Sequence, residues 1–200
     1  MKRKLQQLKK NIITADNIMY ALIISLLAIF SPDLVLMGVY AFLYPYFWFT
    51  RRTHVFPHLY ISSAIALCWM LIAKEQYGYN QEMLVIVEIN IFALCAWALG
   101  LFAIYLIYSY WADRLKYKEL RKKTLLFVVI YWVLILSAET IAYHVFNFRN
   151  ISTEIYAGLP VCDCIHAPGW MQASYLILGL IYFAICELIG LKNPYQIKKK

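Results

Sequence analysis

Charged residues are scarce in this 200-residue chain, where Asp, Glu, Lys and Arg together make up 15%, against roughly 25% in soluble domains. Apolar residues reach 63%, well above the roughly 45–50% that soluble proteins carry. A water-soluble monomer could not bury this much apolar surface, and disordered chains are polar and poor in aromatic residues. The composition excludes both classes and predicts an integral membrane protein.

Glycine is also rare, with seven residues in the chain. No glycine-rich phosphate loop is present, which argues against ATP hydrolysis by this chain, and close packing of helices through small residues is not expected. Aromatic residues, in contrast, make up 17%, so we expect bulky side chains to pack the helices. No motif in the sequence indicates a cofactor, and we predict none.

Six apolar segments have about the length that a membrane-spanning helix needs. We therefore predict an all-α, polytopic membrane bundle with six transmembrane helices. The predicted spans cover residues 11–30, 34–49, 58–73, 83–111, 124–146 and 169–191. They form one membrane domain, in which a basic loop at residues 112–123 separates the first part, 1–111, from the second, 124–200.

Positive charges are distributed unequally between the two faces of this arrangement. All of the 19 lysines and arginines except Lys74 and Arg149 fall on the face that holds both termini. Because cytoplasmic loops retain cations, we predict a multi-pass protein of the cell membrane with both termini in the cytoplasm. The net charge of +8 then indicates contact with membrane lipid and not with nucleic acid. The sequence leaves the oligomeric state open.

Three glutamates, Glu88, Glu139 and Glu187, interrupt apolar segments. Ionisable groups are costly inside a membrane and often functional. Glu187 lies near the end of its predicted helix, from which its side chain can reach the interface. Glu88 and Glu139 lie in the outer third of their predicted helices. Each is either a proton donor or cation partner in a cavity, or a neutral acid hydrogen-bonded to a neighbouring helix.

A second group of reactive residues lies in the outer segment 147–168. Cys162, Cys164 and His166 are side-chain types that bind soft metals. A structural zinc site, however, needs four ligands with CxxC-like spacing, and no second pair is present. We therefore predict no metal site. Asn150 begins an Asn-Ile-Ser glycosylation motif in the same segment.

A weak internal repeat relates the two halves of the chain. In an alignment of the halves, Glu75 corresponds to Glu139 and Glu88 corresponds to Asp163. This pattern suggests two parallel repeats of three spans each, and chance similarity between amphiphilic spans is the alternative interpretation.

The second half resembles the integral-membrane lycopene cyclase domain of bacteria, archaea and fungi, which is built from three-helix repeats. The resemblance covers residues 125–190, and 58–110 more faintly. It rests on Glu139, on the Phe-Asn-Phe turn at 146–148, and on Gly-Leu-Pro-Val-Cys-Asp at 158–163. The family signature is G-L-P-[IVL]-E-E, so Cys162 replaces its first acid.

The resemblance implies a membrane-bound isoprenoid substrate, such as a carotenoid, and ring closure that a carboxylic acid initiates by protonating a double bond. It points to Asp163 and Glu88 as catalytic acids, with Glu139 as the partner base or orienting group, and needs no redox cofactor. Two other classes compete: a small-solute carrier or substrate-binding membrane component, and a non-catalytic membrane scaffold. The enzyme hypothesis predicts that the three acids converge in one cavity, whereas a scaffold predicts dispersed acids with individual partners.

Overall fold

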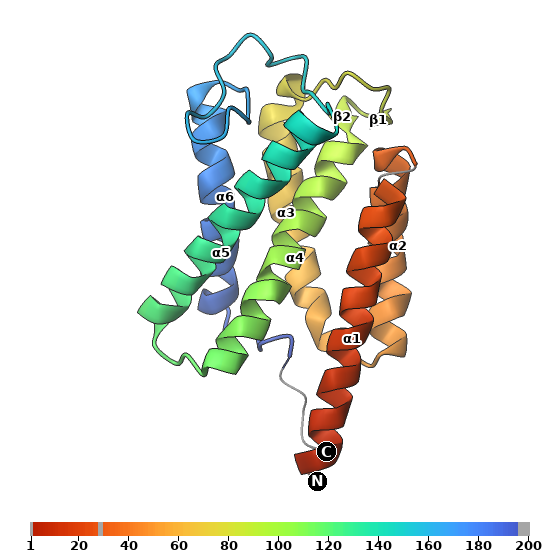
Figure 1. Cartoon of the computed structure of the whole chain (residues 1–200), viewed down its shortest axis with the longest axis vertical. Coiled ribbons are helices and arrows are strands. Elements are labelled where there is room, and N and C mark those ends of the chain that lie inside the picture. The colour runs from red at the N-terminus through yellow and green to blue at the C-terminus, as the bar shows by residue number, and fades with distance from the viewer. Residues whose placement is uncertain (1, 28–29, 196–200) are drawn as a thin grey trace.

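The computed structural model describes residues 2–27 and 30–195, which form a bundle of six α-helices with one small hairpin (Figure 1). The all-α class predicted from the sequence is confirmed. The elements are α1 (Lys2–Leu27), α2 (Pro32–Phe49), η1 (Thr53–Val55), α3 (Phe56–Ala73), η2 (Lys74–Gln76), β1 (Val85–Ile86), β2 (Ile89–Asn90), α4 (Ile91–Leu115), α5 (Leu120–Thr140), the π-helical turn η3 (Ile141–Val145) and α6 (Gly169–Leu188).

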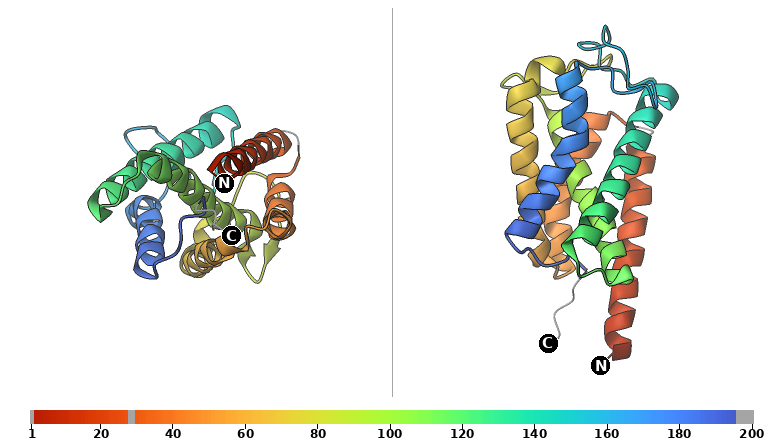
Figure 2. Two further views of the ribbon diagram at one scale, coloured as in Figure 1. Left: turned by 90° about the horizontal axis from the view of Figure 1, so that it is seen from below. Right: turned by 90° about the vertical axis from the view of Figure 1, so that its left-hand side faces the viewer.

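The helices run side by side between two distinct ends (Figures 1 and 2). The start of α1, the α4–α5 turn and residues 192–195 lie at one end, which we call the terminal end. The hairpin and the segment 147–168 lie at the other, the loop end. Helix α4 is central, because it contacts α2, α3, α5 and α6.

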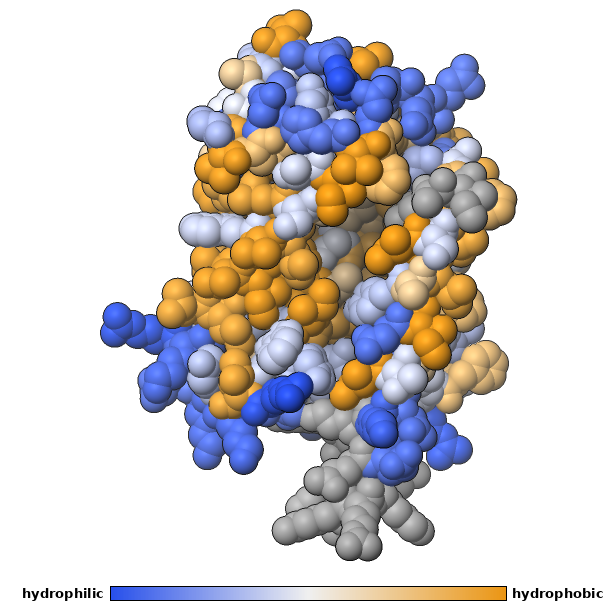
Figure 3. Space-filling model, viewed as in Figure 1, coloured by the Kyte–Doolittle hydropathy of each residue, from blue (hydrophilic) through white to orange (hydrophobic). Residues whose placement is uncertain are grey.

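Among the described residues, four helical segments are long and apolar enough to cross a membrane: Thr53–Gln76, Ile91–Leu115, Leu120–Val145 and Gly169–Leu188. The first two predicted spans correspond to α1 and α2, which are not among these four, and residues 28 and 29 of the first predicted span lie outside the described residues. Lysines occupy the start of α1, and α2 carries Asp33 in its first turn and Pro45 in its interior. The surface carries a broad hydrophobic band between hydrophilic ends (Figure 3), which is compatible with a membrane protein.

The predicted helix at 83–111 is wrong at its beginning, because α4 starts only at Ile91. The preceding residues form a two-stranded antiparallel hairpin in which Ile86 faces Ile89. Val87 and Glu88 form its turn, with φ angles of 48° and 62°, as a two-residue type I′ turn requires. The side chain of Asn90 then caps α4 by accepting a hydrogen bond from a backbone N–H in its first turn. Glu88 is therefore in a turn and not in a helix.

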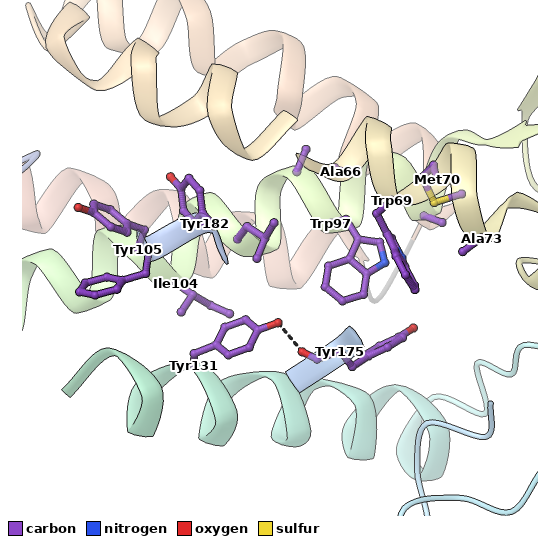
Figure 4. Packing of buried hydrophobic residues seen from close by; sticks show 14 of the residues in the cluster. Ala66, Trp69, Met70, Ala73, Trp97, Ile104, Tyr105, Tyr131, Tyr175 and Tyr182 are labelled. Atoms are coloured by element: carbon purple, nitrogen blue, oxygen red, sulfur yellow. Dashed lines mark hydrogen bonds between the residues drawn. The ribbon is translucent and has the colours of Figure 1, made fainter. Parts of the chain in front are cut away.

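Tyrosine hydroxyls connect the helices through their backbones. Tyr131 on α5 donates to the carbonyl of Tyr175 on α6 at 2.5 Å, as Figure 4 shows, and Tyr182 on α6 donates to the carbonyl of His58 on α3 at 3.0 Å. The ring of Tyr131 lies against Gly179, so closely that a Cβ atom there would overlap it. Bulky residues thus pack the bundle, and this glycine makes room for one of them.

We predict that Gly179→Val destabilises the protein by about 1–3 kcal/mol, because the side chain overpacks the contact with Tyr131. Gly38→Val is the matched control, since a Cβ atom at this helical glycine meets no atom of another described residue within 4 Å. The measurement is thermal unfolding of both variants in detergent, followed by circular dichroism. Equal melting temperatures for the two variants would contradict the packing role assigned to Gly179.

Candidate functional site

A cavity of about 150 Å³ lies near the loop end, between α4, α5, α6 and the segment 147–168. Most of its wall is apolar, with seven aromatic residues among aliphatic ones, and a small polar group completes it. The aromatic residues are Tyr79, Phe92, Trp97, Tyr131, Tyr143, Phe148 and Tyr175. The polar residues are Glu139, Asn150, Glu154 and His166. A mostly apolar pocket with a few convergent polar groups is the usual form of a small-molecule site.

Glu139 is the acid that the bundle itself contributes to this cavity. It lies in the last turn of α5, is half-buried, and makes no hydrogen bond or ion pair with any other described residue. Tyr143 follows it by one helical turn, so both side chains lie on the same face and line the cavity. The π-helical turn η3 carries Tyr143, and such turns occur frequently at functional sites.

The segment that matches the Gly-Leu-Pro signature folds as a tight turn just before residues 165–167, which line the cavity. The Leu159 N–H donates to the Cys164 carbonyl at 2.8 Å, and a disulfide joins Cys162 to Cys164. A Cβ atom at Gly158 would lie 2.9 Å from an oxygen of Asp163 and 3.0 Å from the His166 ring. Glycine is therefore needed here for close approach of the backbone.

The three predicted catalytic acids do not converge. Glu139 lines the cavity, whereas the Asp163 side chain is 79% exposed and touches the cavity only indirectly, through His166 at 3.7 Å. Glu88 is 76% exposed and forms an ion pair with Lys74. This lysine lowers the pKa of the Glu88 carboxyl, first through the hydrogen bond and then through its charge.

His166 is the part of the Cys-x-Cys-x-His motif that reaches the cavity. Its Nδ1 lies 2.9 Å from the Tyr156 carbonyl, and its ring stacks on Tyr143 with centroids 4.6 Å apart. Cys162 and Cys164 bond to each other. Within residues 2–27 and 30–195, no group of three or more His, Cys, Asp or Glu side chains is placed to hold a metal ion.

Asn150 fastens the outer segment to the turn that follows α3. Its amide donates to the Gln76 carbonyl at 2.6 Å and accepts from the Gly78 N–H at 3.2 Å. A second contact between the same segments runs from the Asn80 side chain to the Asn147 carbonyl at 2.8 Å. The amide that the glycosylation motif would modify is thus engaged in joining the two segments beside the cavity.

Tyr79, which lies after α3, is a cavity residue that the sequence analysis did not identify. Its ring packs on Phe148 with centroids 4.7 Å apart, and Phe92 on α4 completes the cluster. Burial raises the pKa of the Tyr79 hydroxyl well above its ordinary value, so this group stays protonated. The sequence feature that could have pointed to Tyr79 is its place beside Asn80 in an outer turn, which resembles the Phe-Asn-Phe turn at 146–148.

No family model, curated protein or solved structure matches this chain. The interpretation of the site therefore rests on its geometry. A carboxylic acid without a charged partner, surrounded by aromatic faces, can donate a proton and can bind or stabilise a cation.

We predict that Asn150→Ala loosens the segment 147–168, because two backbone groups lose their side-chain partner at a cost of about 1–3 kcal/mol. Hydrogen exchange of this segment should speed up while exchange in α4 stays unchanged. Gln81→Ala is the control, since Gln81 is exposed and its side chain makes no hydrogen bond to a described residue. Unchanged exchange in 147–168 would show that Asn150 does not hold the segment in place.

Proposed function

We propose that this chain is an integral membrane enzyme that uses Glu139 to protonate a double bond of an isoprenoid and so initiates ring closure. The observation that carries the proposal is the position of Glu139, an acid that has no charged partner among the described residues and lines a cavity rich in aromatic side chains. The resemblance of residues 125–190 to lycopene cyclase domains supports the substrate class.

Glu139 alone can supply the proton that starts the reaction and take back the proton that ends it. The carboxylic acid gives its proton to a terminal alkene carbon, and the electrons of a second double bond form the new carbon–carbon bond. The resulting cation is stabilised by aromatic faces such as those of Trp97 and Tyr175, whose ring centroids lie 4.7 Å apart. A proton from the neighbouring carbon returns to the carboxylate, so the product is an isomer of the substrate. Burying a lone carboxylate is costly, and the cavity therefore favours the neutral acid.

The size of the cavity limits what enters it. A cavity of about 150 Å³ holds a benzene-sized group, so the end of an isoprenoid chain fits and the rest must lie outside. A second, apolar groove of about 270 Å³ lies between α1, α2 and α4 and shares Ala96 and Gly100 with the cavity. Figure 3 shows the hollow between α4 and α1 on this face. We assign the remaining hydrocarbon chain to this groove.

The proposal includes a six-span arrangement in the cell membrane, with α1 and α2 as the two additional spans. Both termini lie in the cytoplasm in this arrangement. It is supported by the concentration of lysine and arginine at the terminal end of the bundle.

The first test is pigment analysis of a lycopene-accumulating bacterial host that expresses the chain. We expect a cyclised carotenoid, and we expect Glu139→Gln to lower its formation by about 100-fold or more, as the loss of a general acid does. Glu88→Gln makes the same carboxyl-to-amide change at the exposed hairpin turn and should leave the yield unchanged. All variants need equal amounts of protein in the membrane fraction.

Unchanged lycopene in cells whose membranes contain the wild-type chain would overturn cyclisation of this substrate. Equal activity of wild type and Glu139→Gln would overturn the role of Glu139.

A second prediction concerns the groove. Gly100→Leu should reduce turnover at least about tenfold, because the side chain fills the passage between cavity and groove, and losses of this size follow from small misplacements. The backbone tolerates the change, since a Cβ atom at this position meets no other atom within 4 Å. Gly38→Leu, at an equally open helical glycine outside both spaces, is the matched control. Full activity of Gly100→Leu would exclude the groove as the chain-binding site.

A further inference from the structure

A third cavity, of about 510 Å³, lies at the terminal end, on the opposite side of the bundle from Glu139. The last turns of α4 and α6, the α4–α5 turn, the start of α5 and residues 190–193 surround it. Its volume lies within the range typical of ligand sites. None of its residues is part of the Glu139 cavity, so an inference about it does not depend on the proposed function.

The inner wall of this cavity is a set of hydroxyl groups on α4. Tyr105, Tyr108 and Ser109 are almost fully buried, and their spacing places them on one helix face. The Ser109 Oγ atom is buried and has no hydrogen-bond partner within the described part of the chain. Neither tyrosine hydroxyl donates a hydrogen bond to another residue in the described ranges. Because buried hydroxyls are normally hydrogen-bonded, this wall presents donors for a ligand.

The rim of the cavity is basic. Four lysines, at positions 116, 118, 123 and 192, face two carboxylates, those of Asp113 and Glu187. Lys123 pairs with Glu187 at 2.9 Å, whereas Lys116, Lys118 and Lys192 make no ion pair with a described residue. The excess of cations favours an anionic group, and the hydroxyl donors suit its oxygen atoms.

Apolar residues adjoin the same rim. Leu188 and Ile189 follow Glu187 and are 85% and 62% exposed, and Leu115 lies exposed at the end of α4. A free phosphate ion would gain nothing from such neighbours, but the acyl chains of a phospholipid would cover them. Basic pockets between membrane helices are known to bind anionic lipid headgroups.

We propose that this cavity binds the phosphate group of an anionic phospholipid, with Lys116 and Lys118 at the phosphate and the hydroxyls of α4 beneath it. The acyl chains then lie along the exposed leucine and isoleucine residues at the ends of α4 and α6.

The test is titration of the purified full chain, in a non-ionic detergent, with dihexanoyl phosphatidylglycerol by isothermal calorimetry. Lys116→Ala/Lys118→Ala should weaken binding about thirtyfold, from the usual contribution of two lysines near an anionic lipid. Arg121→Ala/Lys122→Ala is the matched control, since it removes the same charge from exposed positions of the same loop region outside the cavity. It should bind like the wild type.

Ser109→Ala distinguishes a specific binding site from general electrostatic attraction between lysines and anionic lipid. It changes no charge, and it should still weaken binding about fivefold because the ligand loses a hydrogen bond. Equal losses in the two charge-changing double variants would overturn the proposal, as would wild-type affinity of Ser109→Ala. Inorganic phosphate binding as tightly as the lipid would assign the cavity to a free anion and would equally overturn it.

Discussion

The ion pair between Asp16 and Arg52 is the interaction on which the arrangement of the outer elements depends. Both side chains are 3% exposed and their charged atoms lie 2.7 Å apart. Asp16 also accepts hydrogen bonds from Tyr46 on α2 and from Tyr195 in the C-terminal segment. One carboxylate thus joins three parts of the chain that are remote in sequence. Breaking such a pair from one side typically costs about 3–5 kcal/mol, because the remaining charge stays buried.

Both candidate binding spaces beyond the Glu139 cavity follow from this pair. It holds α1, which otherwise packs mainly on α2, in the position where α1 forms one wall of the apolar groove beside α4. It also holds the segment ending at Tyr195, which brings Lys192 and Asn193 to the terminal cavity. Asn193 secures the segment further by donating to the Ser109 carbonyl at 2.9 Å. The polar interactions of α1 therefore determine its position in the bundle as much as its apolar length does.

The sequence predicted the helices better than the sites. Apolar length and composition place all six helices in the right order, because each follows from local hydrophobicity. The hairpin was missed because residues 84–91 are as apolar as a helix, and its turn uses Val87 and Glu88 where glycine or asparagine is usual. Side-chain partnerships were also beyond reach. Lys74, just after α3, pairs with Glu88 in the hairpin turn, and Asn150 bonds to the turn after α3, from which α4 and α5 separate it in the sequence. Hydrophobic periodicity carries no information about such contacts between loops.

The three glutamates within apolar sequence show what distinguishes a site from structural charge. Glu88 pairs with Lys74, and Glu187 pairs with Lys123; such individual partners are what a scaffold requires. Glu139 forms no ion pair with any residue that the structure describes, and it faces a cavity with seven aromatic residues in its wall. Removing an acid from water without giving it a partner lowers stability, even when it is only half-buried, so a purely structural role gives no physical reason for the position of Glu139. A reaction that needs a transferable proton does explain this position. A neighbouring lysine would hold the carboxyl as an anion, and the proton would then be lost.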